Sequence, residues 1–217
     1  MGWLSALAAT PSGSVPLVRG LILLVIHPTY LVRGLTYNTL IPPPHISKTL
    51  IYTQYILSMN PAITEQELTE ARKIWGDALV AVSKAYEEGG IDAAKEVANA
   101  ALDGAYGYNL GPVLFKPTLA SGEQTFRPTR EGALSYFVGH NDEYPLDGGF
   151  GIKGWRTVVS ETSASFIQGD VAMWMGWVTF TDKDGNVTKV DKSWGYKKDE
   201  EGTLRIVLHH SSLPYQP

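Results

Sequence analysis

His209 and Ser211 are a pair of side chains in this sequence whose types and spacing fit acid–base or hydrogen-bonding chemistry. His209 and Ser211 are two positions apart in a segment with strand character, and alternation along a strand places both on one face. Hydroxyls donate and accept hydrogen bonds, and imidazole ordinarily titrates near neutral pH. Such a pair at the end of an apolar strand suits a pocket mouth. The pair also fits an ordinary role in bonding the neighbouring strand, and Thr118 and Tyr136 taken alone would be a turn threonine and a core tyrosine.

The same alternation predicts the rest of that last strand. Arg205 and Val207 should share the face of His209 and Ser211. The opposite face should carry Leu204, Ile206, Leu208, His210 and Ser212. Because neighbouring side chains point to opposite faces, His209 and His210 cannot bind one metal ion together.

No metal centre or other cofactor is expected. The sequence has no cysteine, which excludes disulfides, a thiol nucleophile, zinc–cysteine sites and iron–sulfur clusters. The remaining histidines are His27, His45 and His140, so a three-histidine zinc site lacks support.

Three familiar motifs are excluded. Residues 182–186 have the glycine of a calcium loop at the wrong position and Ser193 in place of the final glutamate, so they predict a hairpin turn. The glycine-rich residues 147–151 lack the Lys-Ser or Lys-Thr pair of a phosphate-binding loop and predict a loop closing over the sheet rim. No Gly-x-Ser-x-Gly nucleophile elbow is present.

Composition limits the partners. The sequence has 217 residues and a net charge of −4, and this mild acidity argues against a nucleic-acid-binding face. Hydrophobic residues make up 44%, as in an ordinary globular protein. The most apolar run, residues 15–26, contains Pro16 and Arg19 and is shorter than the roughly 20 residues of a membrane-spanning helix.

The first part of the sequence differs from the rest. The first acidic residue is Glu65, and Pro42-Pro43-Pro44 and Asn60-Pro61 interrupt regular structure. We expect residues 1–58 to be an extension outside the core, with Met59 as the alternative start, and residues 59–217 to form one catalytic domain. A secretory signal and a transit peptide are the competing interpretations, so the expected cytoplasmic location has a plastid or exported alternative.

Two helices open the predicted domain. Thr64 and Glu67 have the spacing of a capping box. Apolar residues then recur at three- and four-residue steps as far as Gly89-Gly90, and a second, shorter helix runs from Asp92 to Gly104.

Beyond Gly104 the sequence predicts strands. The segments are 113–119, near prolines that allow an edge or a bulge, then 156–167, 171–181, 187–196 and 203–212; residues 133–138 fit helix or strand. In 171–181 both faces are apolar, which predicts a central strand covered on both sides. The fold class is α+β, with N-terminal helices packed on a curved antiparallel sheet that forms a cone with an open mouth.

Ordered motifs then give a resemblance. They are Leu114-Phe-Lys-Pro-Thr-Leu-Ala120, Phe126-Arg-Pro-Thr129 followed by Gly132-Ala-Leu-Ser-Tyr-Phe-Val-Gly139, Gly149-Phe-Gly-Ile-Lys153 with Trp155, Lys189-Val-Asp-Lys-Ser193, and Leu208-His-His-Ser-Ser-Leu-Pro-Tyr215. Over residues 60–217 the chain resembles the iota class of carbonic anhydrases, which is related to the association domain of calcium/calmodulin-dependent kinase II and to the wider cystatin-like, nuclear-transport-factor-two-like cone fold. One departure is His140, where a small residue is expected, and it would crowd or tune the pocket mouth.

This resemblance implies reversible hydration of carbon dioxide to bicarbonate, in a pocket lined by Thr118, Tyr136, His209 and Ser211. Some members of the class depend on manganese or zinc, and the lack of metal ligands favours the metal-free type. We expect Tyr136 and Ser211 to activate water, Thr118 to bind, and His209 to orient or shuttle protons. Phe115, Trp174 or Trp177 would supply apolar walls.

Two rival functions stay open at this stage. A cone-fold isomerase or cyclase would need a carboxylate base, for which Asp191 is the candidate. A non-catalytic association module would show a large apolar surface and no turnover. A homodimer is expected under either the enzyme or the module.

Overall fold

The computed structural model describes residues 61–217. Expectations about residues 1–58, the start at Met59, His27 and His45 lie outside the described residues. The helices are α2 (Glu65–Ala105) and α3 (Arg130–Val138), with short 3₁₀ turns η2 (Gly122–Gln124) and η3 (Phe150–Ile152). The strands are β1 (Leu114–Lys116), β2 (Trp155–Gln168), β3 (Val171–Asp182), β4 (Val187–Lys198) and β5 (Leu204–Ser212).

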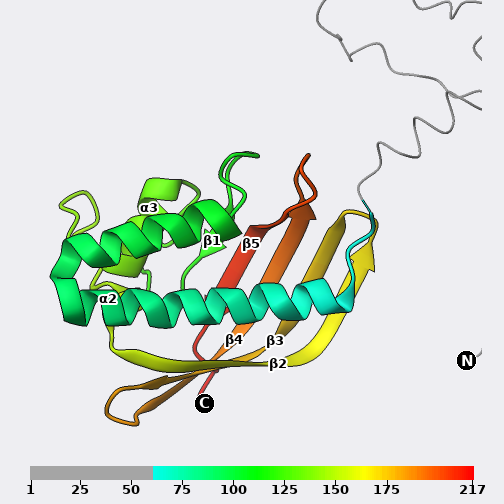
Figure 1. Ribbon diagram of the computed structural model, residues 1–217. Coiled ribbons are helices and arrows are strands. Elements are labelled where there is room, and N and C mark those ends of the chain that lie inside the picture. Colours follow the sequence, from blue (N-terminus) through cyan, green and yellow to red (C-terminus); the bar gives the residue numbers. More distant parts are fainter. Residues whose placement is uncertain (1–60) are drawn as a thin grey trace, which may run out of the picture. The chain divides into compact units, whose positions relative to one another are not determined.

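The two predicted N-terminal helices are the two arms of α2. The Thr64 side chain accepts a hydrogen bond from the Glu67 backbone N–H, and the Glu67 carboxylate accepts one from the Thr64 N–H at 2.8 Å, which confirms the capping box. At Gly90 the backbone leaves helical geometry, with φ 71° and ψ −161°. The chain reverses direction there, so the arms lie side by side (Figure 1).

The sheet has five strands in the order β1-β5-β4-β3-β2. Strands β2 to β5 pair antiparallel, as predicted, but β1 pairs parallel with β5, so the sheet is mixed. The chain reaches this edge through α2 and a long connection, and approaches from the same end as β5. The predicted edge position of β1 is confirmed, and residues 133–138 are helix, in α3.

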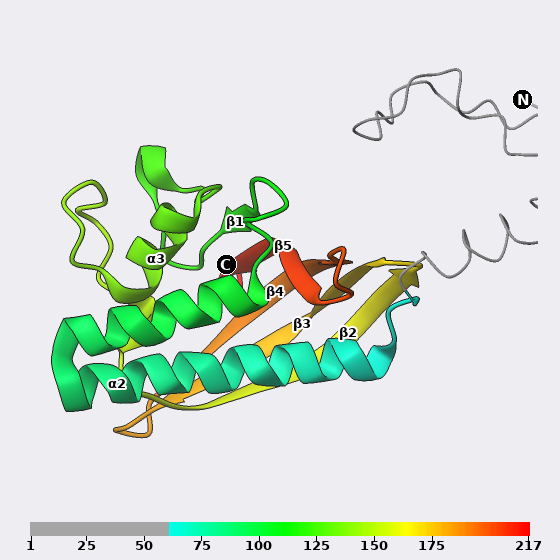
Figure 2. The same ribbon diagram turned by 45° about the horizontal axis from the view of Figure 1, so that its top comes forward.

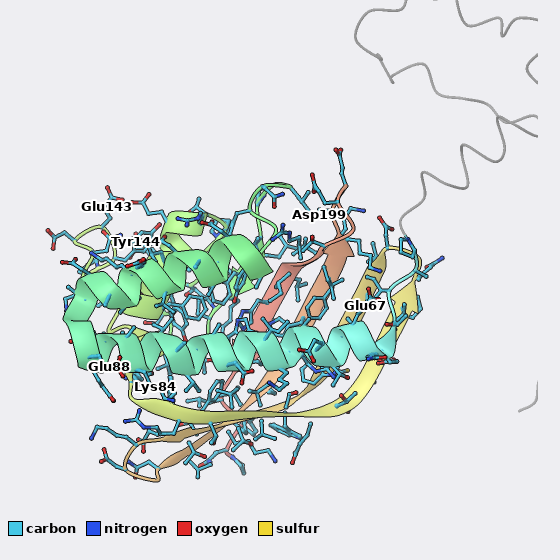
Figure 3. All side chains as sticks on the ribbon, viewed as in Figure 1. Glu67, Lys84, Glu88, Glu143, Tyr144 and Asp199 are labelled. Atoms are coloured by element: carbon cyan, nitrogen blue, oxygen red, sulfur yellow. The ribbon has the colours of Figure 1, made fainter. Side chains whose placement is uncertain are left out.

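The two faces of the sheet differ. Trp174, Val178 and Phe180 of β3 point into the core beneath α2, which crosses one face of the sheet (Figure 2). On the other face of β3, the Met173 and Met175 side chains are 57% and 53% exposed. The central position of β3 is confirmed, but its predicted cover on both sides is wrong within residues 61–217. Side chains fill the layer between α2 and the sheet (Figure 3).

A bulge in β5 corrects the predicted facing of the last strand. Gly195 of β4 pairs with Leu208, whereas the next residue, Tyr196, pairs with Ile206, so Val207 is an extra residue. A bulge of one residue reverses the alternation beyond it. Ile206 therefore faces the core together with His209 and Ser211, all of them buried. The prediction that Arg205 and Val207 share the face of His209 is wrong for this reason.

In the part of the chain that the structure describes, we find no helix long and apolar enough to cross a membrane.

Candidate active site

A narrow cleft lies in the core where α2, α3 and the strands meet. It encloses about 170 Å³ between side chains and at no point admits a sphere the size of water, so a ligand must move side chains to enter. Its lining comprises Trp75, Phe115, Pro117, Thr118, Tyr136, Phe137, Phe150, Lys192 and His209. Three of the four predicted site residues line it, and the fourth, Ser211, bonds directly to Thr118.

The hydroxyls of Thr118 and Ser211 form a hydrogen bond of 2.6 Å. Thr118 follows the edge strand β1, and Ser211 lies near the end of β5 with no exposed surface. The Lys116 ammonium donates to the Ser211 backbone carbonyl at 2.8 Å and ties the two strand ends together. Because the two hydroxyls satisfy each other, a polar ligand can exchange its own hydrogen bonds for theirs at little cost.

Tyr136 presents a buried hydroxyl that has no well-aligned hydrogen-bond partner among the described residues. Burial raises the pKa of Tyr136, and the nearby Leu119 and Thr118 offset this only in part. The phenol therefore keeps its proton at neutral pH. It is a donor without an acceptor, and a buried donor of this kind favours a ligand that brings a negatively charged oxygen.

The helix α3 that carries Tyr136 is held by a buried ion pair. Arg127 donates to Asp147 at 2.9 Å, and both side chains are nearly inaccessible to solvent. Ser135, next to Tyr136, donates to the other carboxylate oxygen of Asp147 at 2.7 Å. The glycine-rich segment at 147–151 thus supplies Asp147 to this pair and Phe150 to the cleft wall.

His209 is held by hydrogen bonds to both ring nitrogens. Its Nε2 lies 2.7 Å from Lys192 Nζ, and its Nδ1 lies 2.8 Å from the Tyr106 hydroxyl, which accepts a bond from Trp75 Nε1–H at 2.9 Å. The ring stacks on Phe115 with centroids 4.5 Å apart. Burial, and then the charge of Lys192, hold the pKa of His209 well below its ordinary value. His209 therefore stays neutral, which fits the expected orienting role and argues against shuttling through an imidazolium.

Lys192 is the functional residue that the sequence analysis missed. Its side chain is buried, and its ammonium lies 4.8 Å from the Trp75 ring centroid and 5.3 Å from that of Trp194. None of the ion pairs among residues 61–217 includes Lys192, so no carboxylate of this region lies within salt-bridge distance of its ammonium. Burial lowers the pKa of Lys192 to about 7, against the opposing charge of Asp191. One signal was present in the sequence: Lys192 alternates with the apolar Val190 and Trp194, on the core-facing side of a strand.

Other predicted features lie away from the cleft. His140 is exposed and contacts the Val138 carbonyl, so it does not crowd the cleft. Asp191 pairs with Trp177 across the strands on the outer face of the sheet, which removes it as a base in the core. Of the expected apolar walls Phe115 lines the cleft, whereas Trp174 and Trp177 do not. His210 is exposed on the face opposite His209, as predicted. Residues 182–186 form the predicted hairpin turn.

Among the described residues, no group of three or more histidine, cysteine, aspartate or glutamate side chains is arranged to hold a metal ion.

Comparison with known proteins identifies the family. The family model for metal-independent carbonic anhydrases matches residues 66–213. A metal-independent carbonic anhydrase from Nostoc sp. (strain PCC 7120) is 53% identical over 158 residues, which cover 73% of this chain and 77% of the relative. This chain belongs to the metal-independent carbonic anhydrases.

One solved structure agrees with this family. The iota-carbonic anhydrase from a cyanobacterium, complexed with bicarbonate, is similar with a TM-score of 0.72 at 53% identity, over 73% of this chain and 96% of that chain. A putative calcium/calmodulin dependent protein kinase II association domain from Xanthomonas campestris has a TM-score of 0.48 at 20% identity, over 74% of this chain and 98% of that one, and supports no further statement.

Family membership confirms the resemblance to iota-class enzymes and the predicted activity. The carbonic anhydrase hydrates carbon dioxide reversibly to bicarbonate, and its family works without a metal, which agrees with the expected lack of a cofactor. The enzyme is therefore favoured over the non-catalytic association module and over the isomerase.

Proposed function

We propose that carbon dioxide is hydrated in the cleft between α3 and the adjoining parts of β1, β4 and β5, with bicarbonate bound by Thr118, Tyr136, His209 and Ser211. The observation that carries this assignment is the buried hydroxyl of Tyr136, which has no well-aligned hydrogen-bond partner among residues 61–217, beside the Thr118–Ser211 pair. A cyanobacterial relative crystallised with bicarbonate supports bicarbonate as the ligand here.

The proposed roles follow from which side chains can donate and which can accept a hydrogen bond. The Thr118 and Ser211 hydroxyls hold and turn the attacking water, because each can donate and accept. Tyr136 donates to an oxygen of carbon dioxide as negative charge develops there, and the surrounding aromatic rings exclude bulk water and strengthen that bond. Ser211 and Tyr136 thus act on the reacting atoms, Thr118 binds, and neutral His209 orients the polar side of the cleft.

The test is stopped-flow hydration of carbon dioxide by the full chain after dialysis against a chelator, comparing Tyr136→Phe with Tyr196→Phe. Tyr196 also has a buried hydroxyl without a hydrogen-bond partner in the described part of the chain, but it lies outside the cleft, so it is a matched control. We expect Tyr136→Phe to lose roughly 100-fold in kcat/KM, as for loss of one oxyanion donor. Tyr196→Phe should keep the wild-type rate, and Ser211→Ala should resemble Tyr136→Phe. Full activity in Tyr136→Phe and Ser211→Ala would remove the chemistry from this cleft.

Three wider properties belong to the same proposal. Residues 59–217 form the catalytic domain, supported by the match over 66–213, and a chain beginning at Met59 should keep full activity. The enzyme is a homodimer, supported by the apolar outer face of the sheet around Phe166, Met173 and Met175; Met175→Glu should shift the mass measured by light scattering to that of a monomer. Its location is the cytoplasm, which cell fractionation tests against the plastid and exported alternatives.

A further inference from the structure

Lys192 is a buried cation for which neither residues 61–217 nor the proposed roles supply an ion-pair partner. A buried charge without an ion pair is costly, and proteins ordinarily pair it or lose its proton. Here the ammonium faces aromatic rings and one imidazole nitrogen, and it lines the same cleft as Thr118 and Tyr136. Lys192 could therefore form an ion pair with an anionic ligand that binds in the cleft and later dissociates.

We infer that Lys192 is a catalytic residue: as a neutral amine it accepts the proton that hydration releases, and as an ammonium it pairs with the bicarbonate formed. The inference rests on the proposed assignment of hydration to this cleft. It adds the positive charge that the hydroxyls and neutral His209 do not supply.

The step balances without a further reactant. The water oxygen forms a bond to the carbon of carbon dioxide, one C=O electron pair moves onto its oxygen, and an O–H bond of the water breaks. The proton goes to Lys192 Nζ, so that carbon dioxide, water and amine become bicarbonate and ammonium. After bicarbonate leaves, the unpaired ammonium returns its proton to solvent.

The hydrogen bonds around His209 fit this use of Lys192. An ammonium has no lone pair, so protonated Lys192 must donate to Nε2, and His209 then carries its own proton on Nδ1 and donates it to Tyr106. His209 is accordingly a positioning residue for the amine. When Lys192 loses a proton and keeps one N–H on Nε2, its lone pair is free for the cleft.

The groups that surround Lys192 Nζ are uncharged, so a bound anionic substrate would have the largest effect on its protonation. His209 faces it from β5 and Tyr136 lines the cleft with it from α3, while Trp75 of α2 and Phe180 of β3 contribute uncharged rings. Asp191, the next residue on β4, lies on the outer face and favours the charged form only at a distance. Bicarbonate would thus bring to Lys192 a direct anionic contact that residues 61–217 do not provide.

The first test is the pH profile of kcat/KM for hydration by the chelated full chain, for wild type, Lys192→Met and Lys198→Met. Lys198 is the matched control, since it is a buried lysine outside the cleft and pairs with Glu67 at 2.7 Å. The wild-type rate should rise with pH through neutrality and then level off. Lys192→Met should lose about 100-fold or more and lose the inflection, as for removal of a general base. Lys198→Met should keep both the rate and the inflection.

The second test is made on the wild-type enzyme, and the variant Lys192→Arg serves only to identify the NMR resonance of Lys192. Lysine Nζ resonances of the wild-type enzyme are titrated by NMR with and without saturating bicarbonate. We expect bicarbonate to move the deprotonation of Lys192 to higher pH, because a bound anion favours the ammonium. An unchanged titration with bicarbonate bound, or an unaltered rate and inflection in Lys192→Met, would overturn the inference and leave the cleft assignment standing. Inactivity of the wild-type enzyme itself would overturn both.

Discussion

Arg127 and Lys192 are both buried cations in the same core, and their surroundings differ in one respect. Arg127 pairs with the Asp147 carboxylate and stacks over Tyr144, and the pair braces α3. Lys192 has aromatic rings and a neutral imidazole around it. Arg127 thus has a resident carboxylate, whereas no carboxylate of residues 61–217 forms an ion pair with Lys192 in the cleft, which leaves Lys192 available to an anionic ligand. The local charge balance thus separates the part of the core that holds the site from the part that does the chemistry.

The largest expected effect on stability comes from breaking the compensated cation. Asp147→Asn removes the charge that Arg127 needs, and loss of one partner of a buried pair costs about 3–5 kcal/mol of unfolding free energy. Chemical denaturation at neutral pH measures this. Because Ser135 also bonds to Asp147, the activity of the remaining folded enzyme should fall as Tyr136 loses its support. An effect below about 1 kcal/mol would mean that the pair is not a structural brace.

A second, smaller effect is the pH dependence of stability that Lys192 imposes. The pKa of Lys192 is lowered to about 7 in the folded enzyme and is ordinary in the unfolded chain, so between these values the unfolded chain binds more protons. Stability should therefore rise with pH above neutrality, by no more than about 1.4 kcal/mol per pH unit. His209, whose folded pKa is also lowered, adds the same sign at acid pH.

Lys192→Met should flatten the pH dependence above neutrality and leave the enzyme at least as stable as wild type at pH 6. Denaturation curves from pH 6 to 9 give this slope. Wild type and Lys192→Met with equal slopes would place Lys192 in an ordinary, compensated environment like that of Arg127.

The smallest expected effect concerns Lys198, which is intermediate between the two. Its partner Glu67 is partly exposed, and the hydrogen bond from Lys198 is the main cause that holds the pKa of Glu67 below its ordinary value. Glu67 also caps α2, so Glu67→Gln can keep the cap hydrogen bond through its single amide oxygen while it removes the charge and the acceptor for Lys198. We expect a loss of about 1 kcal/mol and an unchanged rate of hydration. A loss of unfolding free energy as large as that of Asp147→Asn would show that the partly exposed Lys198–Glu67 pair stabilises the fold as much as the buried Arg127–Asp147 pair.

Much of the fold could be predicted from the sequence because local signals were strong. The capping box at Thr64, the break at Gly90 and the hairpin turns each depend on neighbouring residues. The parallel pairing of β1 and the bulge at Val207 depend on long-range packing, which leaves no mark in the alternation of side chains.

The site shows the same division. Thr118, Tyr136 and the β5 pair His209 and Ser211 come from three separate segments, and only the family resemblance brought them together before the structure did. Lys192 was overlooked because a lysine in a strand is usually exposed, and its burial becomes visible only when Trp75 of α2 packs over it. The neutral state of His209 depends on burial and then on the charge of Lys192, and of its two expected roles it favours orienting over shuttling.

The most direct test of the central claim is the hydration rate of chelated, full-length Lys192→Met at pH 8, measured beside its unfolding free energy. The account predicts a loss of about 100-fold or more in kcat/KM for Lys192→Met. It also predicts that the unfolding free energy of Lys192→Met is several kcal/mol higher than that of Asp147→Asn. A wild-type rate, or a loss of activity that merely follows a loss of folded protein, would contradict it.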